Sequence, residues 1–375
     1  MNRLDLLYDE IKSHAFLRFL DNPKKLAFYG AGVVCEWLLE NAKAYNLPIS
    51  CIVDADKTGN MQGIPIIKKE EFFSNSESKF GDYKFLITTK DYVYAIGKEL
   101  LSRGIDQNDI YVPDRQCLIN GLGLPDFVLA HAYFAVLDLV VYKEHYYNVY
   151  NHLIDENSKT IFLAILKFRV YGRYELDKEL YAPDVSYFHT GYLKLGTKEC
   201  FCDVGAYTGD SIIDFLMKTH HDYDRIYAVE GNAQSCEKLK KKLDIEFQKG
   251  RIEVFNVGAG SKRETIVYNG YRGGIGEDRL NIYTLDELLK GKKVTLIKMD
   301  IEGMEMQALE GAKEIIMTQK PKLAICVYHL IRDIWQIQEK LMQFVPEYQF
   351  CLEQPVHVSM SETVLYAFVG GQSES

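Results

Sequence analysis

The feature that most constrains the fold is a repeated pattern of apolar strand, glycine turn and helix. It occurs first at "KLAFYGAG" (25–32) and again at "FCDVGAYTGDS" (201–211). Further apolar segments follow each copy and alternate with stretches of helical spacing. Strands that alternate with helices form parallel sheets with right-handed crossovers. A chain of 375 residues is long enough for two such domains. The pattern predicts an α/β protein with two Rossmann-like parallel-sheet domains.

The alternation of strands and helices also predicts where the domains end. Residues 1–115 are expected to form an N-terminal Rossmann-like domain with a leading helix. Residues 116–195 show only long helical patterns, such as "SKTIFLAILKFRVYG", which predicts a helical connector. Residues 196–375 return to alternation and end in "YQFCLE" and "TVLYAFV" without a helix between them. This last pair predicts an antiparallel hairpin that closes one edge of the second sheet.

Composition and charge exclude several classes of function. A net charge of −9 and a pI of about 5.6 argue against nucleic acid held by a broad basic surface. The longest apolar run, "FVLAHAYFAVLDLVVY", is too short for a membrane span and contains a histidine and an aspartate. The N-terminus lacks the apolar core of a signal peptide. The eight cysteines form no C-x-x-C pair, which indicates buried free thiols in a reducing compartment. A cytoplasmic protein is predicted.

The turn within "FCDVGAYTGDS" places an acid where dinucleotide sites place none. The strand ends in Asp203, and Gly205, Ala206 and Gly209 follow. A carboxylate here would repel a diphosphate, but it suits the ammonium and sulfonium groups of S-adenosylmethionine. The next strand ends in Glu230, whose carboxylate can accept hydrogen bonds from ribose hydroxyls. The alternative is a generic α/β loop with a capping acid.

Other residues are expected to line the same donor cleft. The end of the third strand, "NVGAGS", offers small residues against which an adenine ring could lie. The additional donor-site candidates are Asp210, Ser211, Asn256, Val257 and Gly258.

The stretch "LIKMDIEGMEMQALEGA" (296–312) gathers charges at the end of the fourth strand. Asp300, Glu302 and His329, the last at the end of the fifth strand, are candidate bases for deprotonating an acceptor hydroxyl. Lys298 and Glu305 are candidates for acceptor binding. The helix dipole accounts for Glu302 and Glu305 equally well, and a histidine at a strand end is often structural.

A divalent cation at the end of the fourth strand is a further alternative. Asp300 with His329 could ligate such an ion, but two ligands are too few to predict a metal.

The polar, glycine-rich segment 268–284, "YNGYRGGIGEDRLNIYT", is expected to be a loop that covers the acceptor. Tyr271 and Arg272 are its candidate contacts. A surface loop without a function is the alternative.

The motifs "FCDVGAYTGDS", "AVEGN", "VYHL" and above all K-x-D-x-E-G-x-E resemble the FkbM-type S-adenosylmethionine-dependent methyltransferases. The resemblance covers most of residues 150–370. It implies a class I methyltransferase fold and O-methylation of sugar hydroxyls on glycans, lipopolysaccharide components or natural products. By motif position, Asp203, Gly205 and Gly209 would hold the methionine end of the donor and Glu230 its ribose. Tyr187 and Phe188 resemble an aromatic pair that covers the cofactor.

The N-terminal domain carries only a partial dinucleotide motif. Gly30 and Gly32 are present, but Cys35 stands in place of the third glycine, and Asp54 ends the second strand where a ribose could be held. The domain resembles nucleotide-binding-like domains attached to some sugar-modifying enzymes. It could bind a nucleotide-linked sugar or a regulatory nucleotide, or serve as a scaffold for a homodimer.

Two rival functions therefore stay open. One is an NAD(P)-dependent oxidoreductase that uses the N-terminal domain, and the other is a non-catalytic nucleotide-binding adapter. The sequence does not name the small-molecule or glycan acceptor, nor decide between O- and N-methylation.

Overall fold

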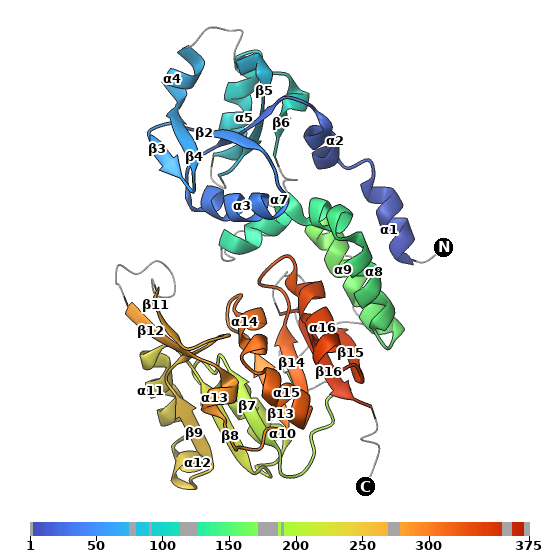
Figure 1. The fold of residues 1–375 in the computed structure, drawn as a ribbon, viewed down its shortest axis with the longest axis vertical. Coiled ribbons are helices and arrows are strands. Elements are labelled where there is room, and N and C mark those ends of the chain that lie inside the picture. Colours follow the sequence, from blue (N-terminus) through green and yellow to red (C-terminus); the bar gives the residue numbers. More distant parts are fainter. Residues whose placement is uncertain are drawn as a thin grey trace. The chain divides into compact units, whose positions relative to one another are not determined.

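The computed structural model describes residues 3–74, 80–89, 92–112, 126–171, 187–188, 191–268, 278–354 and 362–370. The chain divides into two compact units (Figure 1). The N-terminal unit comprises Met1–Tyr147 and Leu163–Glu175, and the C-terminal unit comprises Asn148–Phe162 and Leu176–Ser375. Both units carry mostly parallel sheets, which confirms the predicted α/β class. The division into three domains stays a prediction.

In the described part of the predicted connector, residues 126–171 form three helices. Their bounds are α7 (Asp126–Val141), α8 (Lys143–His152) and α9 (Glu156–Tyr171).

The N-terminal unit is built on a six-stranded sheet of order β3-β4-β2-β1-β5-β6. Its strands are β1 (Lys25–Tyr29), β2 (Ile49–Asp54), β3 (Gly59–Met61), β4 (Ile64–Lys68), β5 (Tyr83–Ile87) and β6 (Ile110–Tyr111). The four predicted strands are β1, β2, β5 and β6, and they pair in parallel. The hairpin of β3 and β4 was not predicted. The signal for these strands is weak because they are short and contain polar residues. Gly59 and Gly63 have positive φ angles, and Pro65 lies within β4, and both residue types are unusual inside strands.

Two helices precede these strands, and further helices and short 3₁₀ turns connect them. They are α1 (Arg3–Ile11), α2 (Ala15–Asp21), α3 (Val33–Ala44), α4 (Lys69–Ser74), α5 (Val93–Ser102), η1 (Phe80–Asp82) and η2 (Gln107–Asp109).

The C-terminal unit contains a seven-stranded sheet of order β15-β16-β14-β13-β7-β8-β9. Its strands are β7 (Cys200–Val204), β8 (Arg225–Val229), β9 (Ile252–Phe255), β13 (Leu296–Met299), β14 (Lys322–Cys326), β15 (Tyr348–Glu353) and β16 (Val364–Val369). The first five pair in parallel, whereas β16 runs antiparallel to both β14 and β15. The predicted hairpin at the sheet edge is therefore present.

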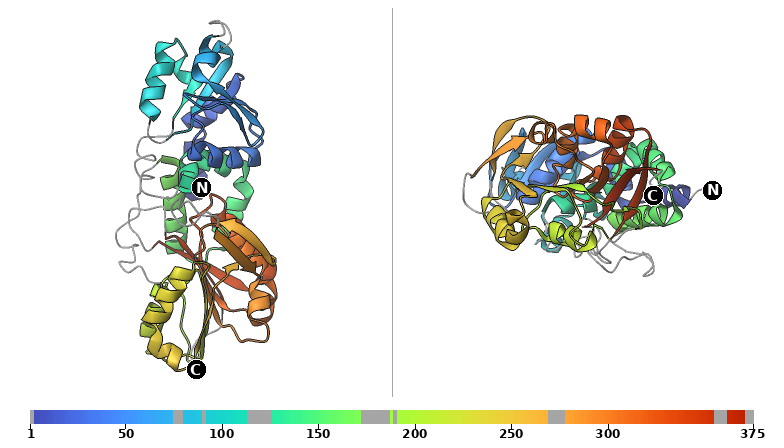
Figure 2. Two further views of the ribbon diagram at one scale, coloured as in Figure 1. Left: turned by 90° about the vertical axis from the view of Figure 1, so that its left-hand side faces the viewer. Right: turned by 90° about the horizontal axis from the view of Figure 1, so that it is seen from below.

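Helices lie on both faces of this sheet. In the left view of Figure 2, yellow α11 lies on one side of the strands and the orange helices lie on the other. The helices are α10 (Asp210–Lys218), α11 (Ala233–Lys242), α12 (Asp244–Gln248), α13 (Leu285–Leu288), α14 (Glu305–Glu310), α15 (Lys313–Gln319) and α16 (Asp333–Phe344). A sheet covered on both faces needs apolar strands, and all residues of β7, β13 and β14 are buried.

A second, three-stranded sheet corrects the predicted loop at 268–284. Strands β10 (Gly258–Ala259), β11 (Glu264–Tyr268) and β12 (Asp278–Tyr283) form it, so 278–283 is strand rather than loop. Leu280 and Ile282 alternate along β12 and pack toward glycines of the unit, which accounts for the strand. Tyr271 and Arg272 lie outside the described residues.

The order of the large sheet fixes where a ligand is expected. The chain leaves β7 toward β8 and β9 and later returns to β13 on the other side of β7. At such a reversal a crevice opens at the carboxyl ends of the two strands, and open α/β sheets bind their ligands there. A ligand is therefore expected at the turns after β7 and β13.

Two further sequence predictions concern cysteines and membranes. The seven cysteines in the described part of the chain are all free and buried. Among the described helices, none combines the length and apolar character that crossing a bilayer requires.

Candidate functional site

The turn after β7 is built around a glycine that touches the next strand. Gly205 has a φ of +81°, and a Cβ added to it would lie 1.9 Å from the carbonyl oxygen of Asp300. Only glycine fits such a position. Ala206 follows and is buried, and Gly209, with a φ of +89°, precedes the first residue of α10. The predicted glycine turn therefore lies directly beside the predicted catalytic strand.

Asp203 is completely buried, and its two oxygens face groups of the chain itself. Ser211 Oγ donates to Oδ2 at 2.5 Å, and Lys298 Nζ lies 3.2 Å from Oδ1. Lys298 also donates to the carbonyl of Gly205 at 2.9 Å. Although burial opposes it, the carboxylates of Asp203 and Asp300 raise the pKa of Lys298, so the lysine is charged. Asp203, Ser211 and Lys298 thus stabilise the turn from its buried side.

The other predicted residue of the turn, Asp210, is exposed. It forms an ion pair with Lys242 at 2.8 Å and accepts a hydrogen bond from Thr208. The bond to Lys242 lowers the pKa of the Asp210 carboxyl.

Glu230 closes the turn from the end of β8. Its Oε2 accepts the backbone N–H of Tyr207 at 2.8 Å, and its Oε1 accepts that of Asn232 at 2.7 Å. Asn256 Nδ2 donates to the carbonyls of Glu230 and Gly231. Glu230 and Asn256 therefore lie together at the sheet edge. Tyr207, which sequence reasoning did not single out, is 61% exposed with a φ of +45° beside them.

The small residues predicted for adenine lie against a leucine and an isoleucine of β12. A Cβ on Gly258 would lie 2.5 Å from Ile282 Cδ1 and 3.1 Å from Leu280 Cδ2. A Cβ on Gly231 would lie 2.9 Å from Leu280 Cδ1. The glycines make room for these side chains after β8 and β9, and Val257 lies between β9 and β10.

The predicted aromatic pair separates into two environments. Tyr187 donates through its hydroxyl to Asp300 Oδ2 at 3.0 Å. Phe188 is buried in the core, edge-on to Phe201 and Phe215. Of the pair, Tyr187 reaches the polar site and Phe188 packs beneath it.

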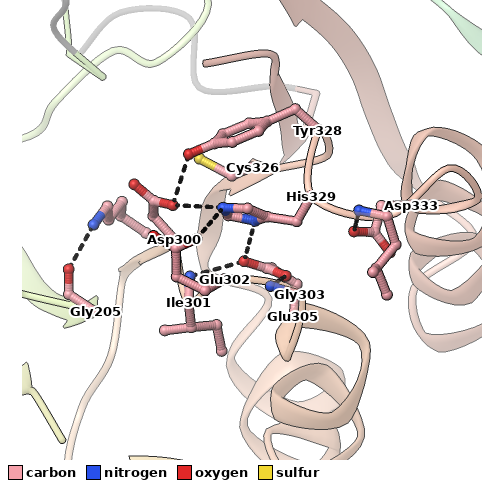
Figure 3. A network of polar contacts seen from close by, with 12 residues as sticks. Gly205, Asp300, Ile301, Glu302, Gly303, Glu305, Cys326, Tyr328, His329 and Asp333 are labelled. Atoms are coloured by element: carbon pink, nitrogen blue, oxygen red, sulfur yellow. Dashed lines mark hydrogen bonds and ion pairs between the residues drawn. The ribbon is translucent and has the colours of Figure 1, made fainter. Parts of the chain in front are cut away.

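Asp300 is the centre of a polar network at the ends of β13 and β14 (Figure 3). Besides Tyr187, the hydroxyl of Tyr328 donates to it at 3.3 Å, and His329 Nε2 lies 3.5 Å from its Oδ1. Although burial opposes it, Lys298 and then His329 lower the pKa of Asp300. The Asp300 side chain is 24% exposed, so it is a charged group within reach of a ligand.

His329 is completely buried and faces three carboxylates. Its Nδ1 lies 2.9 Å from Glu305 Oε1, and its Nε2 lies 3.6 Å from Glu302 Oε2 in addition to Asp300. Burial alone would lower the pKa of His329, but the hydrogen bond and charge of Glu305 raise it to about 9. Carboxylates therefore hold the imidazole ring in place, and this arrangement fits both the structural and the functional explanation of His329.

The turn between β13 and α14 holds Glu305 in place. Glu305 is fully buried, and its two oxygens accept the N–H groups of Ile301 and Gly303 at 2.8 and 3.0 Å. Glu302 adopts a left-handed conformation with a φ of +57°, which is uncommon for a residue with a side chain. Burial raises the pKa of Glu302.

Sequence reasoning missed a fourth acid, Glu362. Burial and then the Asp300 carboxylate raise its pKa to about 7. A signal was available: an antiparallel β16 must begin beside the end of β14, where His329 follows. Tyr328 and Cys326, whose Sγ lies 3.5 Å from the Tyr187 hydroxyl, were also not assigned to the site.

Among the described residues, one group has the ligand spacing of a metal site. Asp300, Glu305 and His329 each offer a ligand atom, and these atoms lie within 4.8 Å of one another. Two of them are the pair that the sequence considered.

The partial nucleotide motif of the N-terminal unit is engaged with its own backbone. Asp54 Oδ2 accepts the N–H of Ala31 at 2.7 Å, and its Oδ1 accepts those of Asp56 and Lys57 at 3.0 Å. These hydrogen bonds, despite burial, lower the pKa of Asp54. Gly30 has a φ of +111°, and Gly32 precedes the first residue of α3. The acid expected at a ribose thus stabilises the glycine turn.

Comparisons with known proteins find a methyltransferase family model and a structure of similar fold. Residues 203–352 match the model of the methyltransferase FkbM domain. Among solved structures, the chain is similar to the methyltransferase FkbM from Methylobacillus flagellatus KT, with 22% identity, 96% of each chain covered and a TM-score of 0.60. This likeness shows a shared fold. No curated protein gives a significant match.

Two further solved structures are similar over about half of the chain. An rRNA methylase from Streptococcus thermophilus is 15% identical, over 47% of this chain and 88% of its own, with a TM-score of 0.32. Fibrillarin from Aeropyrum pernix, with natively bound S-adenosyl-L-methionine, is 12% identical over 47% and 70%, with a TM-score of 0.31. Scores this low establish no common fold.

Proposed function

Because residues 203–352 form an FkbM-type methyltransferase domain, we propose that the protein transfers a methyl group from S-adenosylmethionine to a hydroxyl group. The acceptor we propose is a sugar hydroxyl on a glycan, a nucleotide-linked sugar or a natural product. One observation carries the proposal: the glycine turn after β7 touches the backbone of Asp300, the partly exposed acid of the network. A donor in the turn and an acceptor at Asp300 would therefore be neighbours.

The donor half of this proposal rests on the turn and on Glu230. Both oxygens of Glu230 already accept one backbone N–H each, yet each keeps a second lone pair for a ribose hydroxyl. Both lysines at the turn are paired with carboxylates, Lys298 with Asp203 and Lys242 with Asp210, so neither offers an uncompensated charge that would favour a diphosphate. Leu280, which packs over Gly231 and Gly258, gives an adenine ring an apolar neighbour.

The acceptor half rests on the exposure of the acids. Transfer of the methyl group to a hydroxyl yields a methyl ether, S-adenosylhomocysteine and one proton. Asp300 and Glu302 are 24% and 38% exposed, whereas His329 is completely buried. A hydroxyl can therefore contact either carboxylate directly. Asp300 is placed best to accept its proton, because its backbone adjoins the glycine turn that would hold the donor. His329 acts through Asp300 and is a positioning residue.

The two rival functions find less support. An NAD(P)-dependent oxidoreductase would need Asp54 for a ribose, but three backbone N–H groups already bind that carboxylate, two of them at Oδ1, whereas Glu230 accepts only one at each oxygen. A non-catalytic adapter has no need for three carboxylates gathered around one buried histidine, an arrangement that is costly without a ligand or a reaction.

The test is a calorimetric titration of the full chain with S-adenosylmethionine and, separately, with NAD. We expect donor binding that Glu230→Ala weakens at least tenfold and no NAD binding. Glu237→Ala, at an exposed acid of α11, is the control and leaves the affinity unchanged. Binding of NAD without any response to the donor contradicts the proposal. Release of S-adenosylhomocysteine with a panel of glycans then separates enzyme from adapter.

A further inference from the structure

The contacts of His329 resemble those of a metal-binding histidine more than those of a histidine that only forms hydrogen bonds. Its Nδ1 makes a close contact with Glu305 at 2.9 Å (Figure 3). Its Nε2 lies near oxygens of two different side chains, 3.5 Å from Asp300 Oδ1 and 3.6 Å from Glu302 Oε2. Hydrogen bonds between nitrogen and oxygen are mostly shorter, about 2.7 to 3.2 Å.

The longer distances fit two ligands of one ion. Metal–ligand bonds of about 2.1 Å place neighbouring ligand atoms about 3.0 Å apart at a right angle and about 3.4 Å apart at the tetrahedral angle. The Nε2–oxygen distances of 3.5 and 3.6 Å are therefore within a few tenths of an ångström of that spacing. The described residues whose ligand atoms all lie within 4.8 Å of one another are Asp300, Glu305 and His329, so the Glu302 carboxylate would have to move toward Asp300 to complete the coordination.

Glu305 supplies what a metal-binding histidine ordinarily has on its other nitrogen. Such a histidine donates its second ring N–H to a carboxylate or carbonyl, which fixes the orientation of the ring. Glu305 Oε1 occupies that position, and the N–H groups of Ile301 and Gly303 hold the carboxylate from behind. Although Glu305 lies within ligand distance, these three donors use its oxygens, so we assign it the orienting role.

The backbone also directs a second carboxylate to this point. Glu302 is in the left-handed region with a φ of +57°, and Gly303 follows with a φ of +95°. Strained conformations of this kind persist where the surrounding structure or a function requires them. Here the conformation brings the Glu302 carboxylate to His329 Nε2 while 38% of the side chain stays exposed.

We propose that His329 Nε2, Asp300 and Glu302 bind one divalent cation of the first transition row, such as Mn²⁺ or Zn²⁺. One imidazole and two carboxylates suit these ions better than Mg²⁺ or Ca²⁺, which prefer oxygen ligands alone. The inference rests on the proposed methyltransferase function, because the remaining coordination positions would take the acceptor hydroxyl. With an ion bound, that hydroxyl would be polarised and its proton would pass to a carboxylate of the cluster.

The test measures the ion itself. The full chain is stripped with a chelator and titrated with Mn²⁺, and free Mn²⁺ is followed by electron paramagnetic resonance. We expect one ion per chain, with affinity lowered at least tenfold by Glu302→Gln and about 10- to 100-fold by Glu305→Gln. Glu310→Gln is the matched control, since Glu310 is 39% exposed and pairs with Lys340. It leaves the affinity unchanged. Circular dichroism spectra confirm that each variant folds.

The outcomes separate this inference from the proposed function. S-Adenosylmethionine is titrated into the same stripped protein, where donor binding does not need the ion. Donor binding without saturable Mn²⁺ binding overturns the metal site and leaves the methyltransferase proposal standing. Mn²⁺ binding that Glu302→Gln and Glu310→Gln affect equally also overturns it. Specific Mn²⁺ binding without donor binding instead contradicts the proposed function.

Discussion

Replacing Gly205 by alanine tests whether the turn after β7 is fixed against β13. The new Cβ would lie 1.9 Å from the carbonyl oxygen of Asp300 and 2.9 Å from Ile301 Cγ2. The left-handed backbone costs about 1 to 2 kcal/mol for a residue with a side chain. Overpacking against atoms that cannot move away adds about 2 to 3 kcal/mol. We expect Gly205→Ala to lower the free energy of unfolding by about 3 to 5 kcal/mol.

The control separates the clash from the backbone conformation. Gly250 has a φ of +67° and open space around its Cα, so Gly250→Ala should cost only about 1 to 2 kcal/mol. Both variants are made in a Trp37→Phe background, in which the buried Trp335 alone reports on the C-terminal unit. At a urea dependence of about 2 kcal/mol per molar, the two midpoints should differ by about 1 M. Equal midpoints would refute the reasoning, because the turn could then move away from Asp300.

Two other predictions concern buried charges. Lys298→Met leaves the carboxylate of Asp203 buried without its cation, so urea unfolding should show a loss of about 3 to 5 kcal/mol. Adding Asp203→Asn should restore more than 1 kcal/mol, and no recovery would contradict the ion pair. Glu246 is held by Lys249, Tyr223 and His221, which despite burial lower its pKa from 4.5 to about 2. Because the folded-state pKa is the lower one, this stabilisation is complete above about pH 4.5 and is lost as the pH falls to about 2. Unfolding midpoints measured across that range should converge for wild type and Glu246→Gln, and parallel curves would contradict the assignment.

Much of the fold follows from the local sequence. Strands buried on both faces are continuous apolar runs, and this is why the parallel strands and the edge hairpin of β15 and β16 could be predicted. Short strands carry a weaker signal. The β3–β4 hairpin has three to five residues per strand with Pro65 among them, and β12 follows a stretch so rich in glycine that the whole of 268–284 read as a loop.

The sequence proposed one site for Asp300, Glu302 and His329, which lie side by side in the structure, but it did not give the partners of the site residues, and their roles stay predictions. Asp203 and Lys298 are directly opposite each other in the register of β7 and β13, so they pair. No local pattern gives the register between two strands 95 residues apart in the chain. The sequence also does not tell which residue of the pair Tyr187 and Phe188 faces the core. In the structure Phe188 packs in the core, and Tyr187 contacts Asp300.

Two hydrogen bonds and one close backbone contact join the turn after β7 to the acceptor side of the proposed site. The N–H of Asp300 donates to the carbonyl of Val204, Lys298 donates to the carbonyl of Gly205, and Gly205 abuts the Asp300 carbonyl. All three lie in or next to paired central strands, where the backbone is least free to move. Methyl transfer needs the donor carbon, the leaving sulfur and the attacking oxygen in line. A turn and a carboxylate that share one rigid piece of sheet can hold that alignment without relying on a loop.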